Sequence, residues 1–198
     1  MAKKLETKIN TNTIILIFIA ILLAFLAGFF INNQSSNNYM GSMMQNSQNS
    51  KYSQNEVMFA AMMIPHHEQA VTMSNMALTN TTNPKVLDLA QRIKAGQEPE
   101  IIQMNTWLDG SYSMMDHSGH LMGGMLSDQD LEKLGTLKNK DFDEMFLTAM
   151  IEHHEGALQM TQMILNSSNN EVKTLADNII NSQTKEIAEM KELLDNLS

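Results

Sequence analysis

The chain contains the same sequence unit twice, which restricts the folds that it can adopt. Residues 59–79 align without gaps with residues 146–166, and both copies contain the triplet His-His-Glu. After one deletion, residues 86–109 align with residues 172–195, where Val, Leu, Ala, Ile, Gln, Glu, Met and Asp recur at matching positions. The fold must therefore bring together two units of similar structure.

Each copy is predicted to fold as two helices joined by a turn. Apolar residues recur at steps of three and four in both segments of each copy, which is the spacing of one helix face. Asn83-Pro84 marks a helix start, because it offers an N-cap residue followed by proline at the first helical position. Asn169-Asn170 takes the matching place in the second copy. Two such hairpins can bury their apolar faces against each other, so we predict an all-α, four-helix bundle.

Residues 110–140 connect the two copies and form a predicted crossover rich in methionine and histidine. Ser127 to Leu134 is predicted to be a short capped helix. Before it lies the sequence MMDHSGHLMGGM, from Met114 to Met125, whose composition is unsuited to a core but suited to wrapping a metal. The bundle is thus predicted to comprise residues 56–198, with repeats at 57–109 and 144–196.

The N-terminal region is predicted to hold a transmembrane anchor. Residues 14–31 form an unbroken apolar run of about the minimum length that crosses a bilayer, and three lysines precede it. By the positive-inside rule, we expect residues 1–13 in the cytoplasm and the rest of the chain on the extracytoplasmic side of the plasma membrane. Residues 32–55, rich in Asn, Ser and Gln, are predicted to be a disordered tether. A cleavable signal peptide is the alternative for the apolar run.

The histidines are grouped rather than scattered. At 100° per residue, His66 lies at the centre of the apolar stripe of its predicted helix, and His153 has the same phase in the second copy. His67 and His154 lie at the edge of the stripe, where they would face a partner helix or solvent. All six histidines of the chain fall into the pairs His66-His67, His117 with His120, and His153-His154.

The second helix of each copy places a carboxylate, Glu100 or Glu186, among apolar residues. A buried carboxylate is costly unless it is paired or bound to a metal. One interpretation makes these residues metal ligands beside the histidines. The other makes them structural ion-pair partners of His66 and His153, with the methionines as ordinary core residues. We favour the metal site, because the second interpretation leaves the grouping of the histidines and the separate Met/His loop without explanation.

The ligand types favour copper. The chain has 19 methionines and no cysteine, which excludes thiolate zinc sites and iron–sulfur clusters. Thioether and imidazole together suit Cu(I), with Cu(II) and silver as further options. No glutamate lies three residues before a histidine, which argues against the di-iron centre of some four-helix bundles. The net charge of −9 argues against a nucleic-acid partner.

The pattern Met-Ile-x-His-His-Glu-x-Ala-x-x-Met-x-x-Met, followed by Gln-x-x-Glu-Ile-x-x-Met, resembles the family known as domain of unknown function 305. The resemblance covers about residues 56–197 and implies a ferritin-like four-helix bundle. Some members are copper-binding proteins of the bacterial envelope involved in copper tolerance, so the resemblance also implies a copper site. With the crossover included, the predicted metal ligands are His66, His67, Met73, Met76, Glu100, Met104, His117, His120, His153, His154, Met160, Met163, Glu186 and Met190.

These observations predict a membrane-anchored, extracytoplasmic protein that sequesters copper or hands it on to other copper-handling proteins. Two alternatives stay open. One is a copper-dependent redox enzyme resembling a cuprous oxidase, and the other is a structural or interaction bundle that binds no metal. We favour binding over catalysis. The sequence contains no legible nucleophile–base triad, phosphate loop or nucleotide fingerprint, so hydrolase and nucleotide-dependent functions have no support.

Overall fold

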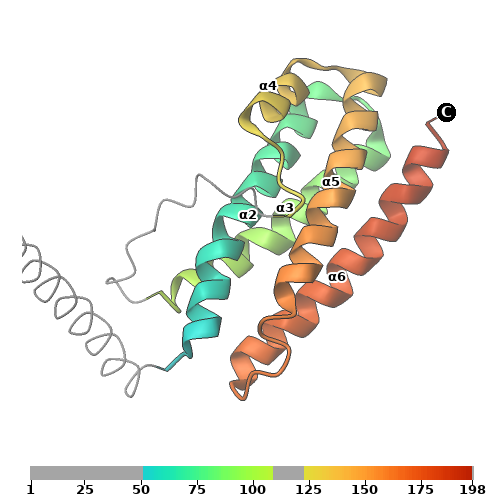
Figure 1. Cartoon of the computed structure of the whole chain (residues 1–198). Coiled ribbons are helices and arrows are strands. Elements are labelled where there is room, and N and C mark those ends of the chain that lie inside the picture. Colours follow the sequence, from blue (N-terminus) through green and yellow to red (C-terminus); the bar gives the residue numbers. More distant parts are fainter. Residues whose placement is uncertain (1–50, 109–122, 198) are drawn as a thin grey trace, which may run out of the picture. The chain divides into compact units, whose positions relative to one another are not determined.

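The computed structural model describes residues 51–108 and 123–197. Within these ranges it contains five helices and no strand (Figure 1). None of these helices combines the length and the apolar character that a membrane span needs. The predicted anchor at residues 14–31 and most of the predicted tether lie outside the described residues. The helices are α2 (Gln54–Asn80), α3 (Pro84–Asn105), α4 (Asp128–Thr136), α5 (Asn139–Thr161) and α6 (Asn170–Asp195).

The four long helices form a bundle of two hairpins, as Figure 1 shows. Helix α2 packs along α3, and α5 packs along α6, while the two hairpins meet mainly through α2 and α5. The structure contains the predicted N-cap at the start of the second helix of each hairpin. The Asn83 side chain accepts a hydrogen bond from the backbone N–H of Lys85, and the Asn169 side chain accepts one from Glu171. The short predicted helix is α4, which begins after its N-cap Ser127.

Helix α2 begins at Gln54, within the last residues of the predicted tether. Ser53 caps the helix, because its side chain accepts a hydrogen bond from Glu56, whose carboxylate in turn accepts one from the Ser53 backbone N–H. Tyr52 is buried, and its ring packs on Trp107 with centroids 5.3 Å apart. This apolar contact and the capping box hold the last residues of the predicted tether on the bundle.

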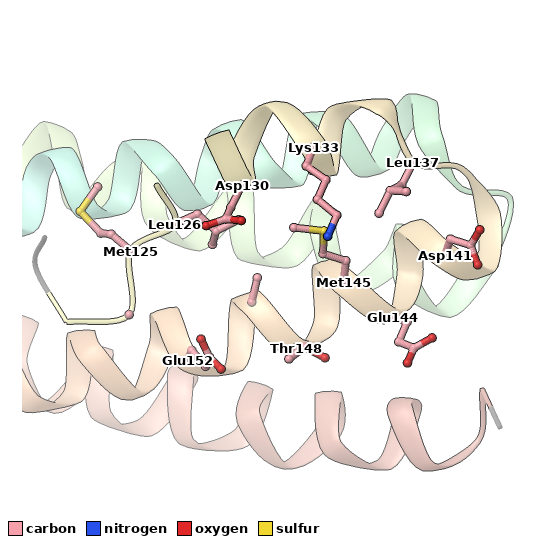
Figure 2. A pocket seen from close by; sticks show the side chains of 12 residues that line it. Met125, Leu126, Asp130, Lys133, Leu137, Asp141, Glu144, Met145, Thr148 and Glu152 are labelled. Carbon is pink, nitrogen blue, oxygen red and sulfur yellow. The ribbon is translucent and has the colours of Figure 1, made fainter. Parts of the chain in front are cut away.

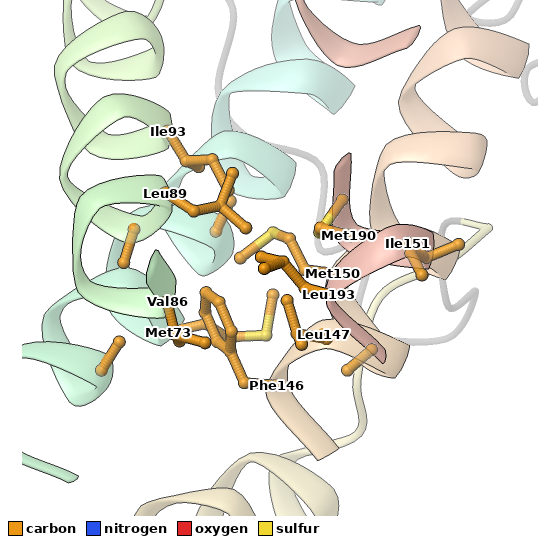
Figure 3. Packing of buried hydrophobic residues seen from close by; sticks show 14 of the residues in the cluster. Met73, Val86, Leu89, Ile93, Phe146, Leu147, Met150, Ile151, Met190 and Leu193 are labelled. Atoms are coloured by element: carbon orange, nitrogen blue, oxygen red, sulfur yellow. The ribbon is translucent and has the colours of Figure 1, made fainter. Parts of the chain in front are cut away.

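The core consists of two methionine-containing clusters. The Met150 cluster contains Met73, Met150 and Met190, which Figure 3 shows together with Phe146, and it also contains Phe142. The sequence repeat maps its three methionines and Phe146 onto members of the second cluster. This Met63 cluster contains Met63, Met104 and Met160, with Phe59 and Trp107.

The two clusters lie on opposite sides of the histidines along the helices. On α2, His66 and His67 lie between Met63 and the Met150-cluster residue Met73. On α5 the order of the clusters is reversed. Met150 precedes His153 and His154, and Met160 of the Met63 cluster follows them. The repeat therefore places four histidines at the centre of the bundle, with thioether sulfurs on both sides.

Candidate metal centre

His66 and His153 meet at the centre of the bundle. They come from α2 and α5, and both side chains are fully buried. Their ring centroids lie 3.7 Å apart, with an angle of 38° between the ring planes. The predicted position of both histidines at the centre of the apolar stripe therefore agrees with the structure.

His67 and His154 each face the partner helix of their own hairpin. His67 Nε2 lies 2.8 Å from Glu100 Oε2 on α3, and His154 Nε2 lies 2.8 Å from Glu186 Oε2 on α6. Both histidines are fully buried, whereas the carboxylate side chains keep 16% and 14% of their surface exposed.

The alternative interpretation, in which these carboxylates form ion pairs with His66 and His153, is right about the kind of pair but names the wrong histidine of each His-His sequence. His67 lies about 100° around α2 from His66, which turns it toward α3, and the repeat gives His154 the same direction toward α6. The carboxylates therefore pair with the second histidine of each pair.

The hydrogen bonds of these rings set which nitrogen carries the proton. A carbonyl or carboxylate oxygen only accepts, so the Nε2 atom that contacts it must donate. His66 Nε2 lies 3.2 Å from the Gly123 carbonyl, and the Nε2 atoms of His67 and His154 face carboxylates. In a neutral ring with this arrangement, Nδ1 carries the free lone pair, which is the form that binds a metal.

Five buried ring nitrogens lack a hydrogen-bond partner among the described residues. They are the Nδ1 atoms of all four histidines and the Nε2 atom of His153. A buried polar atom without a partner costs about 1–3 kcal/mol. Unsatisfied nitrogens on four buried histidines are better explained by a ligand than by packing, and a metal ion satisfies nitrogen lone pairs of this kind.

Burial keeps the central histidines neutral. Desolvation lowers the pKa of His66 to about 3, although the hydrogen bond to the Gly123 carbonyl opposes the shift. Desolvation and the neighbouring histidines also hold the pKa of His153 well below its usual value. Both rings are therefore unprotonated at neutral pH, so a metal ion does not have to displace a proton from either of them.

The end of the crossover lies directly against the histidines. Gly123 contacts His66 through its carbonyl, and Gly124 has a positive φ of 83°. A Cβ atom on Gly124 would overlap the backbone of Glu152, and one on Gly156 would overlap Gly123. The side-chain amide of Gln69 adds two hydrogen bonds to the backbone of Leu126.

The two repeats differ where the crossover passes over them. Gln69 and Gly156 occupy the same repeat position, yet one binds the crossover by hydrogen bonds and the other makes room for it. The predicted ligands His117 and His120 lie outside the described residues.

The predicted thioether ligands are distributed over both core clusters. Met73 and Met190 belong to the Met150 cluster, whereas Met104 and Met160 belong to the Met63 cluster. Met76 and Met163 are partly buried and pack against the edges of these clusters. Among the described residues, no three His, Asp or Glu side chains are gathered closely enough to form a ready coordination shell.

Sequence reasoning did not single out two glutamines, Gln97 and Gln183, as site residues. Both are buried, and neither the amide nitrogen nor the amide oxygen of either one has a hydrogen-bond partner among the described residues. They line a cavity of about 340 Å³ between α3 and α6, together with Glu100 and Glu186. The sequence could have indicated both glutamines as site residues, because each repeat has a glutamine at the same position on an apolar helix face.

A second cavity, of about 490 Å³, lies between α4, α5 and the end of the crossover (Figure 2). It contains none of the histidines. Lys133 is the single cationic side chain among the described residues that line it, and the acidic side chains are Asp130, Asp141, Glu144 and Glu152.

The fold and the site define the class of this protein. It is a helical bundle built from two repeat-related hairpins, with four buried histidines at its centre. The chain belongs to the DUF305 family, described as "Domain of unknown function (DUF305)", which it matches over residues 56–194. This match confirms the resemblance inferred from the His-His-Glu pattern.

Several solved structures share the fold. A DUF305 fragment from Deinococcus radiodurans is 30% identical, with a TM-score of 0.65, over 73% of this chain and 97% of that one. CopM in the Cu(II)-bound form is 36% identical, with a TM-score of 0.63, over 72% and 97%. CopM in the Cu(I)-bound form is 35% identical, with a TM-score of 0.57, over 71% and 96%.

A shorter similarity links the chain to a viral protein. Uncharacterized protein L153 of Acanthamoeba polyphaga mimivirus is 45% identical over 47 residues. The matched segment is 24% of this chain and 31% of that protein, so it spans about a third of the relative.

Proposed function

We propose that this protein binds copper ions as cargo at the centre of its bundle and sequesters them or hands them on. The observation that carries the proposal is the group of four buried histidines whose Nδ1 atoms have no partner among the described residues. Neutral imidazole nitrogen is a ligand for both Cu(I) and Cu(II). The ligands are close together but not gathered into a shell, so we expect the rings to rotate when the ion binds.

The surrounding residues take distinct roles in this proposal. Glu100 and Glu186 hold the imidazoles of His67 and His154 by accepting hydrogen bonds from their Nε2 atoms, which leaves Nδ1 to face the metal. The two methionine clusters supply thioether sulfur on either side of the histidines, and thioether favours Cu(I). We therefore assign Cu(I) as the preferred cargo, with Cu(II) and silver as further ions that the same ligands accept.

The similar structures support this choice of metal. CopM has been solved in Cu(II)-bound, Cu(I)-bound and silver-bound forms, and it is 34–36% identical to this chain in those structures. That range of ions matches a ligand set of imidazole and thioether without thiolate.

We also propose that residues 14–31 anchor the protein in the plasma membrane, with the bundle on the extracytoplasmic side. The apolar run and the lysines before it support this orientation. Protease added to intact cells should then degrade the bundle, and the protein should stay with the membrane fraction after a carbonate wash. Recovery of a soluble chain that begins after the apolar run would instead show a cleaved signal peptide.

An anaerobic Cu(I) titration against a chromophoric chelator tests the copper proposal. We would compare the full chain in detergent with a variant carrying His66→Phe and His153→Phe, in which a phenyl ring fills the space of each imidazole. A variant carrying His117→Phe and His120→Phe provides the matched control in the crossover. Circular dichroism would show that both variants keep the helical fold.

Tight binding that disappears in the His66/His153 variant and persists in the His117/His120 variant supports the proposal. The reverse pattern would move the site to the crossover. Tight binding unchanged in both variants, or absent from the wild-type chain, would contradict a copper site at the centre of the bundle.

A further inference from the structure

The groove between α3 and α6 is lined by the two carboxylates that hydrogen-bond to buried histidines, Glu100 and Glu186. These two helices make few contacts with each other, and a cavity of about 340 Å³ lies between them. Its lining contains Gln97 and Glu100 from α3 and Gln183 and Glu186 from α6, which are equivalent pairs in the two repeats. Because residues three apart lie on one helix face, each helix turns a Gln–Glu pair toward the groove.

The two glutamines are an unusual choice for this position. Gln97 is 4% exposed and Gln183 is 2% exposed, and the amide nitrogen and oxygen of both have no hydrogen-bond partner among the described residues. A buried amide is costly unless its groups are satisfied, and leucine would fill a similar volume without that cost. Two unsatisfied amides that line one cavity therefore point to a polar ligand.

The carboxylates continue the polar lining toward the centre of the bundle. Each is partly exposed, and each accepts a hydrogen bond through Oε2 from a fully buried histidine, His67 or His154. The groove thus borders the carboxylates that hold the imidazoles of His67 and His154, whose free lone pairs are on Nδ1. A cation that moves along this lining can exchange water for amide and carboxylate oxygen before it reaches nitrogen.

We propose that the α3–α6 groove is a cation site through which hydrated Cu(II) reaches the buried histidines, with the amide oxygens of Gln97 and Gln183 as ligands along the way. Among the described residues of its lining, the exposed Lys185 is the single cationic side chain, beside the two carboxylates. This inference rests on the proposed copper-binding function. Oxygen donors suit a divalent ion better than Cu(I), which prefers the sulfur ligands of the core clusters. The step is ligand exchange alone: water leaves the ion, protein oxygen and then nitrogen replace it, and no electron is transferred.

Gly96 offers a way to close the groove without changing any ligand. It lies on α3 and lines the cavity, and a Cβ atom added to it would meet nothing within 4 Å. Gly96→Phe should therefore place a ring in the groove without disturbing the helix. Gly96→Ala is the matched control, because it also removes the flexible glycine from the helix and leaves the groove open.

The test measures how fast the full chain in detergent takes up Cu(II). Copper sulfate in glycine buffer would be mixed with each variant in a stopped-flow instrument, with quenching of Trp107, the single tryptophan, as the signal. We expect Gly96→Phe to take up copper about tenfold more slowly than Gly96→Ala, which corresponds to about 1.4 kcal/mol in the barrier. The equilibrium affinity should be the same for both variants. Equal uptake rates would overturn the proposal.

A second variant tests the glutamines themselves. Gln97→Leu combined with Gln183→Leu removes both amides, and exposed Gln91→Leu on α3 is the control. We expect slower uptake in the double variant together with an unchanged or higher melting temperature, because no hydrogen bond is lost. A lower melting temperature with wild-type uptake would show that the amides only support the fold.

The outcomes distinguish the two proposals. If the wild-type chain binds no copper at all, the proposed function fails. If it binds copper and the variants take up copper as fast as the wild type, only the proposed role of the groove is overturned.

Discussion

His66 and His153 occupy the same position in the two repeats and meet at the centre of the bundle, with their tilted rings 3.7 Å apart between centroids. Both are fully buried, and burial holds the pKa of each ring below its usual value. Because two imidazolium ions this close would repel each other in a medium of low dielectric constant, the folded state requires both rings to stay neutral. The ligand group of the proposed site is therefore also the acid-sensitive part of the fold.

The first prediction concerns stability against pH. Unfolding returns both histidines to a pKa near 6.5, so the unfolded chain binds more protons than the folded chain below that pH. The free energy of unfolding is therefore greatest above about pH 6.5 and decreases as the pH falls toward about 3, the pKa of His66 in the folded chain. Each neutral histidine should contribute up to about 1.4 kcal/mol per pH unit. Urea denaturation of the metal-free chain at several pH values measures this slope.

The control for this slope is the variant with His66→Phe and His153→Phe, which keeps the carboxylates and loses both titrating rings. Its stability should depend less steeply on pH between about pH 6 and pH 4. An identical slope in the wild type and the variant would mean that groups other than His66 and His153 account for the acid sensitivity.

The second prediction concerns the carboxylates that hold His67 and His154. Glu100→Gln and Glu186→Gln keep the size of each side chain but remove its charge. If these residues orient the imidazoles toward a metal, each change should weaken copper binding by about 10–100-fold. Competition titration measures the loss, and exposed Glu98→Gln on α3 is the control for general charge effects. A loss of equal size in Glu98→Gln would show that only the overall negative charge matters.

The third prediction concerns the close packing of the crossover on α5. A Cβ atom at Gly156 would overlap the backbone of Gly123, which contacts His66. Gly156→Ala should therefore destabilise the fold by about 1–3 kcal/mol, although alanine is the better helix former. Gly96→Ala, also in a helix but with open space around it, should stabilise the fold by about 0.5–1 kcal/mol. Thermal melts of both variants would contradict this account if the two changes had the same sign.

Much of the architecture is predictable because the signals are local and occur twice. The three- and four-residue apolar spacing, together with Asn83 and Asn169 as caps, is enough to indicate two helical hairpins. The phase of His66 and His153 on the apolar stripe places both at the centre. These inferences depend on helix geometry, which a sequence records directly.

The partners across helices are not predictable in the same way. Helix phase shows which way His67 points, but not that Glu100 on a different helix stands opposite it. Nor does periodicity show that Gly123 passes over His66, because a loop follows no repeat. The unpaired amide of Gln97 becomes informative only when its surroundings are known, since an amide on an apolar face can equally well find a partner.

The last prediction separates the sulfur ligands from the nitrogen ligands. Met73, Met150 and Met190 are fully buried in the Met150 cluster, and leucine has a similar volume to methionine. Replacing all three by leucine should cost less than about 1.5 kcal/mol at each position, so the fold should survive. Leucine offers no sulfur, and thioether stabilises Cu(I) more than Cu(II). Titrations of the variant under anaerobic and aerobic conditions should therefore show weaker Cu(I) binding and unchanged Cu(II) binding. Equal binding of Cu(I) by the wild type and the variant would identify these three methionines as core residues alone.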